Sequence, residues 1–292
     1  MSGTPLPIRS FLATEPNIGT RLSLSTWIVG FILIELVWTF LGGAVTFLVS
    51  EVTRNRPYSS ASWTVYLIQH ANFVVLLGTL VLFATKALRV SVLRFITDGR
   101  TFRWPLFRFA LFVWLSGIAS ATLVTLVIEP HAILPNDTGL IGDRLLLMSL
   151  AVVLTPLQCL AEELLFRTML WRMLALRIRA GWIIGMLSGA VFTLAHLTNV
   201  EVQSGGFEVL VISYYFLSGF LFMEMTRRHH GTEAAIGAHI ANNLFLVLVV
   251  NYSGSSLPGD PWFIQQAPLI WLDLVVLMTC SWIIITYGSR YQ

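Results

Sequence analysis

Charged side chains are scarce in this sequence. Only 11% of its 292 residues are Asp, Glu, Lys or Arg, whereas 56% are hydrophobic, and the mean hydropathy is +0.77. A soluble domain carries about a quarter charged residues, so the composition excludes an ordinary soluble protein. The net charge of +3 is small. Basic loops of a membrane protein account for it, and we expect no nucleic-acid partner.

Cysteine and the common nucleotide-binding motifs are also missing or nearly so. Cys159 and Cys280 both fall in apolar stretches, where we expect them to pack and not to form a disulfide. The sequence has no GxGxxG, P-loop, CxxC or internal repeat. Its first 26 residues lack an apolar core and a cleavage site, so no removable signal peptide is expected.

Long apolar runs dominate what is present. A helix needs about 20 apolar residues to cross a membrane, and these runs are too uniformly apolar for barrel strands. The sequence therefore predicts an all-α, polytopic membrane bundle of about eight transmembrane helices. It forms one transmembrane domain, 27–288, between a cytoplasmic segment, 1–26, and a short tail, 289–292. The expected spans are 27–50, 63–86, 105–128, 145–166, 181–200, 207–226, 233–251 and 267–288.

The basic residues predict the orientation of these spans. Cytoplasmic loops of membrane proteins carry an excess of Lys and Arg. With the N-terminus inside, 15 of the 18 basic residues fall in or beside inner loops, and only Arg54, Arg56 and Arg144 fall outside. Both termini are then cytoplasmic and the number of spans is even. We expect a multi-pass protein of a bacterial plasma membrane.

Ionisable side chains inside spans are candidates for function, because burying them is costly. Glu35, His70 and Asp273 are each alone on their spans, and such residues more often make hydrogen bonds between helices. The remaining candidates cluster on three later spans. They are Glu162, Glu163, Arg167, His196 and His239, with Asn242 and Asn243 as polar neighbours.

These later candidates form pairs four residues apart, which share one face of a helix. The pairs are Glu163 with Arg167, Phe192 with His196, and His239 with Asn243. We expect Glu163 and Arg167 to form an ion pair within their helix. Glu162 is then left without a local partner, and a carboxylate in such a place suits a general base or acid.

The depths of three candidates agree. At 1.5 Å per residue, Glu162, His196 and His239 lie about 21, 22 and 16 Å from the inner ends of their spans. These levels differ by about one helical turn. The three side chains can therefore reach one cavity.

Three short motifs carry a resemblance to a known family. "EELLFR" (162–167) fits an EExxxR motif, "FTLAH" (192–196) fits FxxxH, and "HIANN" (239–243) fits HxxxN. In this order, on separate spans, they resemble the CAAX prenyl protease and bacteriocin-processing (CPBP or Abi) family of intramembrane endopeptidases. The resemblance covers about 145–251, the expected catalytic region.

The resemblance implies a proteolytic mechanism. Glu162 and His196 would activate a water molecule, while His239 and Asn243 would stabilise the oxyanion. Arg167 would support the site by pairing with Glu163, and Phe192 belongs to the motif of His196. Asn242, next to Asn243, leaves the oxyanion residue open by one position. The expected partners are the lipid bilayer and a membrane-associated peptide or protein, prenylated and CAAX-like among others.

Other readings of the same residues stay open. Zinc is an alternative cofactor, and Glu162, His196 and His239 would then be its ligands. We favour a mechanism without metal or other cofactor, because the sequence has no HExxH pair. A catalytically silent bacteriocin-immunity or scaffold protein is an alternative function. A proton-coupled transporter is another, although the sequence lacks the matching broken helices of transporter repeats.

Overall fold

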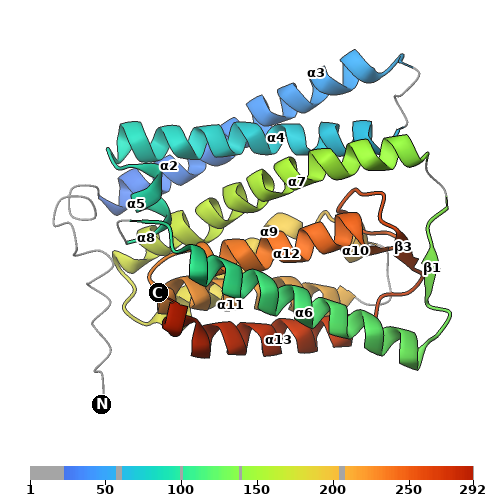
Figure 1. Cartoon of the computed structure of the whole chain (residues 1–292). Helices are drawn as coiled ribbons and strands as arrows, with labels where there is room; N and C mark the ends of the chain where they lie inside the picture. The colour runs from blue at the N-terminus through green and yellow to red at the C-terminus, as the bar shows by residue number, and fades with distance from the viewer. Residues whose placement is uncertain (1–22, 57–60, 99–100, 138–139, 204–207, 292) are drawn as a thin grey trace.

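The structure is a computed structural model that describes residues 23–56, 61–98, 101–137, 140–203 and 208–291. Most of the expected cytoplasmic segment 1–26, and the last residue of the expected tail 289–292, lie outside these ranges. The described residues are mainly helical (Figure 1). The all-α class predicted from the sequence is confirmed.

Each of the eight predicted spans coincides with helix. Within the described residues, six helical stretches are long and apolar enough to cross a membrane. They contain α2, η1 and α3 (Leu24–Val37, Trp38–Gly42, Gly43–Thr53), α4 with η2 (Ser62–Leu82, Phe83–Ala87), α6 (Trp104–Ile128), α7 with η3 and α8 (Ile141–Glu163, Leu164–Met169, Leu170–Ala175), α11 (Glu208–His229), and α13 with η4 (Ile270–Tyr287, Gly288–Tyr291).

The other two predicted spans form shorter apolar helices. These are α9 (Gly181–His196) and α12 (Glu233–Leu248), each of 16 residues. They are short of the length that a full crossing needs. The structure therefore supports six crossings by length, and the count of eight stays a prediction.

The long elements run back and forth between two ends of the bundle (Figure 1). One end holds α5 (Val92–Ile96), α8, the turn between α11 and α12, and the C-terminus. The connections at this end, which we call the basic end, carry Lys86, Arg94, Arg103, Arg177 and Arg228 among others. This alternation fits the predicted topology, while the assignment of this end to the cytoplasm stays a prediction.

A small sheet closes the opposite end, which we call the sheet end. Its strands are β1 (Ile133–Pro135), β3 (Phe263–Gln265) and β2 (Val250–Tyr252), in that order. Strand β3 pairs antiparallel with β1 and parallel with β2. Beside it, Arg144 is buried and lies 3.1 Å from Asp260. Arg144, one of the three basic residues predicted outside, is thus part of a structural ion pair.

Close contacts between backbones hold the helices of the predicted site. A Cβ at Gly237 of α12 would lie 2.5 Å from the carbonyl oxygen of Phe107 in α6. A Cβ at Gly219 of α11 would lie 2.7 Å from the Cα of Gly189 in α9. Small residues allow membrane helices to approach this closely. Glycine therefore fixes α12 against α6 and α11 against α9.

Helix α12 lies at the centre of the bundle. Its residues Glu233–Ala241 are all buried, and it packs against α6, α7 and α11. By contrast, Phe40, Leu123 and Val127 are among many large apolar side chains exposed on the peripheral helices. Apolar surface of this extent marks contact with lipid in a chain of this composition. The protein is a multi-pass integral membrane protein.

Candidate active site

One cavity of about 340 Å³ collects the candidate residues from the three motifs. We call it the catalytic cavity. It reaches from α7 to the loop after β2, at the sheet end. Its lining includes His70, Gln158, Glu162, Arg167, Phe192, His196, Tyr214, Tyr215, His239, Asn242 and Asn243.

Glu162 is buried on the last turn of α7, and two side chains meet its carboxylate. Gln158, one turn earlier, donates a hydrogen bond from Nε2 to Oε1 of Glu162 at 3.1 Å. His239 of α12 approaches from the other side, with Nε2 3.8 Å from Oε2. From the sequence alone, Glu162 has no expected partner within its helix. Gln158 is such a partner, but it is neutral and leaves the charge of Glu162 uncompensated within its helix.

Glu163 lies between a cation and a histidine. Its Oε2 is 3.3 Å from Nε of Arg167, so the ion pair predicted from the sequence is present. Its Oε1 accepts a hydrogen bond from Nδ1 of His239 at 2.8 Å. Glu163 and Arg167 are fully buried. Glu163 therefore joins α7 to α12 and turns the Nε2 edge of His239 toward Glu162 and the cavity.

Aromatic rings surround the guanidinium of Arg167. Its central carbon lies 4.2 Å from the ring centre of Phe192, 5.4 Å from that of Phe222 and 6.0 Å from that of Phe166. Within the described residues its nitrogen atoms make no hydrogen bond. The cation is thus held by its ion pair with Glu163 and by cation–π attraction.

A π-helical turn, η3, follows Glu163 directly and contains Arg167. The N–H of Leu170 reaches the carbonyl of Leu165, five residues back. Short π-helical turns inside α-helices occur often at functional sites. Here the wider turn carries Arg167 between α7 and α8.

His196 occupies the last position of α9 and is half-buried. Its Nδ1 lies 2.7 Å from the carbonyl oxygen of Phe192 and donates to it, which leaves Nε2 as an acceptor. Its ring stacks on Tyr215, with ring centres 4.5 Å apart. Phe192 thus contributes its carbonyl to His196 and its ring to Arg167. This double contact gives a physical reason for the spacing of the FxxxH motif.

Asn242 and Asn243 both line the cavity, but they differ in their hydrogen bonds. The Oδ1 of Asn242 accepts from Nε1 of Trp114 at 3.3 Å and from the hydroxyl of Tyr214 at 3.5 Å. The Nδ2 of Asn242 donates to Oδ1 of Asn243 at 3.1 Å. Within the described residues, Nδ2 of Asn243 has no acceptor. Asn243 is therefore held by its neighbour and keeps a donor for a ligand.

His70 is alone on its span in the sequence, which favours a hydrogen bond between helices over a role in the site. The structure contains such a contact, because Nε2 of His70 lies 2.9 Å from Oε1 of Gln158. Because Gln158 also bonds Glu162, His70 of α4 becomes part of the same chain of side chains and lines the cavity. The spacing of four residues between Gln158 and Glu162 places them on one helix face, so their hydrogen bond could have been predicted from the sequence.

A zinc ion at this site would need at least three of these side chains to converge on one point. Within the described ranges, no three His, Cys, Asp or Glu side chains are grouped as a metal site. Glu162, His196 and His239, the alternative ligands, are thus not arranged as a zinc centre.

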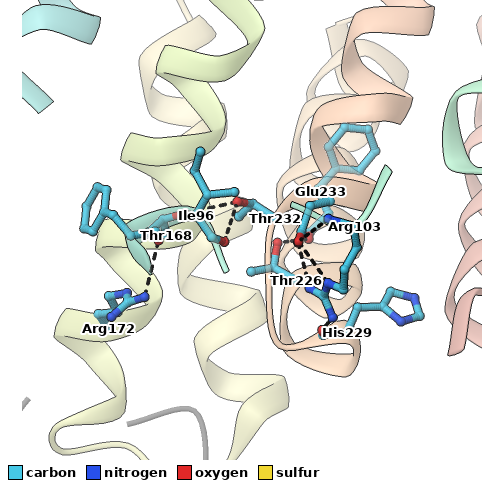
Figure 2. A network of polar contacts seen from close by, with 10 residues as sticks. Ile96, Arg103, Thr168, Arg172, Thr226, His229, Thr232 and Glu233 are labelled. Atoms are coloured by element: carbon cyan, nitrogen blue, oxygen red, sulfur yellow. Dashed lines mark hydrogen bonds and ion pairs between the residues drawn. The ribbon is translucent and has the colours of Figure 1, made fainter. Parts of the chain in front are cut away.

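Figure 2 shows the polar network that fixes the start of α12, at the basic end. Arg103 donates from Nε and Nη2 to the two carboxylate oxygens of Glu233, at 2.9 and 2.7 Å. Thr232 donates from its hydroxyl to the carbonyl of Ile96 at 3.0 Å. Arg172 donates to backbone carbonyls of the α5 segment. Since His239 lies less than two turns beyond Glu233, this network also positions the catalytic cavity.

Replacing Arg103 by Lys is expected to destabilise the start of α12. Lysine keeps the charge but loses the two-pronged contact with Glu233, so the free energy of unfolding should fall by about 1–3 kcal/mol. Thermal unfolding of the purified protein in detergent measures the change. Arg228→Lys is the matched control, because Arg228 is largely exposed and its pair with Glu224 is worth at most about 1 kcal/mol. Equal melting temperatures for the two variants would contradict the role of Arg103.

Known proteins resemble this chain over part of its length. Residues 144–245 match the family described as type II CAAX prenyl endopeptidase Rce1-like. The uncharacterized protein YyaK of Bacillus subtilis (strain 168) is 26% identical over 167 residues, which is 57% of this chain and 54% of that protein. The chain thus spans about half the length of this relative. No solved structure matches.

The matched region and the site are the same part of the chain. Residues 144–245 contain all three motifs and end just beyond Asn243. The family is one of proteases. Residues 144–245 are therefore similar to the family of type II CAAX prenyl endopeptidases described as Rce1-like, and the resemblance that the three motifs indicate is confirmed over this region.

Proposed function

We propose that this protein is an intramembrane endopeptidase. It hydrolyses peptide bonds of membrane-associated proteins or peptides, prenylated or CAAX-like ones among them, in the plasma membrane of a bacterium. One observation carries the proposal: Glu162, His196, His239 and Asn243, from three separate helices, line one cavity inside the bundle. The family match over residues 144–245 and the bacterial relative support it.

The proposed attack uses water and no protein nucleophile. Glu162 and Nε2 of His196 are the acceptors that can take a proton from a water molecule in the cavity. The water oxygen forms a bond to the carbonyl carbon of the substrate, and the carbonyl oxygen takes the negative charge. When the C–N bond breaks, the proton is passed to the leaving amine. One water is consumed, and a carboxyl and an amino terminus are formed.

The proposed oxyanion site is made by α12. His239 is bonded to Glu163 through Nδ1 and presents Nε2 to the cavity, and in its doubly protonated form it donates from both ring nitrogens. Asn243 adds the Nδ2 donor described above. Two donors aimed at a developing negative charge in a buried site stabilise the transition state.

The two asparagines should differ in kinetic effect. Asn243→Ala is expected to lower kcat by roughly 10²–10³-fold, because an oxyanion donor is lost. Asn242→Ala should lower kcat much less, since Asn242 acts on Asn243 and holds Trp114 and Tyr214. Steady-state cleavage of one reporter peptide by both purified variants measures the difference. A larger loss of kcat for Asn242→Ala would show that Asn242, and not Asn243, is the oxyanion residue.

The proposed activity is tested by comparing protein termini in membranes from cells with wild type or Glu162→Gln at equal expression. New termini that depend on Glu162 would support an endopeptidase and identify its substrates. Identical termini in the two strains, with the native host as background, would instead favour a catalytically silent immunity or scaffold protein.

A further inference from the structure

A second cavity of about 210 Å³ adjoins the catalytic cavity. It lies among α6, α11, α12, α13 and β2, toward the sheet end. Pockets for whole small molecules usually hold about 300–1,000 Å³, so this volume suits a side chain. The residues that line both cavities are Trp114, Glu201, Tyr214, Tyr215, Asn242, Leu246 and Tyr252. We call the second cavity the side pocket.

The charges that line the side pocket are of one sign. Glu201 and Asp273 are acidic, and none of the described residues that line it is Lys, Arg or His. Glu201 already has partners: the hydroxyl of Tyr215 donates to it, and so does the N–H of Ser256 at 2.9 Å. A negative, partly enclosed space of this kind favours a cation over an anion.

Asp273 is the acid in this pocket without a partner. It lies in the first turn of α13, and its side chain is exposed where it lines the pocket. Within the described residues, it makes no hydrogen bond and no ion pair. A cation that covers this carboxylate in the pocket would shield it from water, and the attraction between the two charges is then stronger than in bulk water.

The aromatic and apolar residues of the side pocket can contact the cationic group and the methylene stem of a basic side chain. Trp114, Tyr214 and Tyr252 provide aromatic surfaces, which attract ammonium and guanidinium groups. Ile118 and Val276 provide apolar surface for a methylene stem. Asn242 lies in the wall between the two cavities, next to the oxyanion residue Asn243. A side chain in the pocket would therefore belong to a substrate residue close to the cleaved bond.

We propose that the side pocket binds a Lys or Arg side chain of the substrate near the cleaved bond, with Asp273 as its ion-pair partner. The inference rests on the proposed endopeptidase function and adds a substrate preference to it. Asp273 is then a specificity residue and takes no part in bond cleavage.

The test begins with membrane protein termini from cells that express wild type, Glu162→Gln, Asp273→Asn or Glu129→Gln at equal levels. Termini that depend on Glu162 should carry Lys or Arg at one fixed position relative to the cut. That enrichment should disappear with Asp273→Asn. Glu129→Gln is the matched control: Glu129 is an exposed acid at the sheet end that lines neither cavity, so the enrichment should persist.

Purified enzymes then measure the preference on one identified substrate and its Lys→Met or Arg→Met form. The ratio of kcat/KM for the basic over the methionine form should fall at least tenfold in Asp273→Asn, because a close, desolvated charge pair is lost. Asp273→Glu, which keeps the charge, should retain most of the ratio. Melting temperatures show whether each variant is folded.

The outcomes separate the two proposals. Glu162-dependent termini that show no enrichment of Lys or Arg at any position, or an apolar residue in its place, would overturn the proposed preference. So would a ratio that Asp273→Asn does not change. The proposed endopeptidase activity would still be supported. No Glu162-dependent termini at all would remove the proposed function and this inference with it.

Discussion

Purified Glu162→Gln protein is expected to cleave a reporter peptide roughly 10²–10⁴-fold more slowly than wild type, the range of a general acid–base catalyst. Glutamine has nearly the same shape as glutamate, and its Oε1 can still accept the hydrogen bond from Gln158. Its amide cannot take a proton from water. The fold should persist, because no cation in the described structure depends on Glu162 as its main partner.

The measurement is kcat/KM of both proteins on the same peptide in lipid nanodiscs, with melting temperatures alongside. Glu51→Gln serves as control: Glu51 is exposed, its ion-pair partner among the described residues is Arg54, and the rate of this variant should equal that of wild type. Activity of Glu162→Gln within a few-fold of wild type, at equal folding, would remove Glu162 from the role of base.

Glu163→Gln should have the opposite profile: a large loss of stability. The carboxylate is fully buried and compensates Arg167, and it also accepts the hydrogen bond from His239. Removing one partner of a buried pair leaves an uncompensated charge, which costs about 3–5 kcal/mol. We expect less folded protein in the membrane and a much lower melting temperature, even where activity per folded molecule survives.

Thermal unfolding of Glu162→Gln, Glu163→Gln and a double variant, Glu163→Gln with Arg167→Met, separates charge from packing. The double variant removes the unpaired cation and should recover part of the lost stability. Equal melting temperatures for Glu162→Gln and Glu163→Gln would show that Glu163 is no more important for stability than Glu162.

The membrane spans could be predicted because apolar length alone decides them. All eight expected segments coincide with helix, but α9 and α12 have only 16 residues each. The predicted span 233–251 continues past Leu248, the last residue of α12, and overlaps strand β2. Apolar residues continue through Val249 and Val250, so composition does not mark the point where the helix ends.

Contacts within one helix were accessible from the sequence, whereas contacts between helices were not. The spacing of Glu163 and Arg167 predicts their ion pair, which the structure contains. No spacing predicts that Glu163 also bonds His239, 76 positions away. The link from His70 through Gln158 to Glu162 also depends on the packing of α4 against α7.

The sheet end was absent from the prediction for a similar reason. Its strands have three residues each, too few for an alternating pattern to emerge. The pairing of β1 with β3 joins segments more than 100 positions apart, as does the buried pair of Arg144 and Asp260. Counting Arg144 as a loop charge was reasonable from sequence, but its charge is compensated in the fold.

The π-helical turn after Glu163 can lose one residue without changing the direction in which the side chains of α7 and α8 point. A turn closed by a bond to the fifth residue back holds one residue more than an α-helical turn. Loss of one residue from Leu164–Met169 would let the helix continue in α geometry, with α7 and α8 both facing as they do now. The same loss between Pro156 and Glu162 would rotate the carboxylates by about 100° relative to the rest of α7. A one-residue deletion at η3 would thus leave Glu162 facing His239, whereas one earlier in α7 would not.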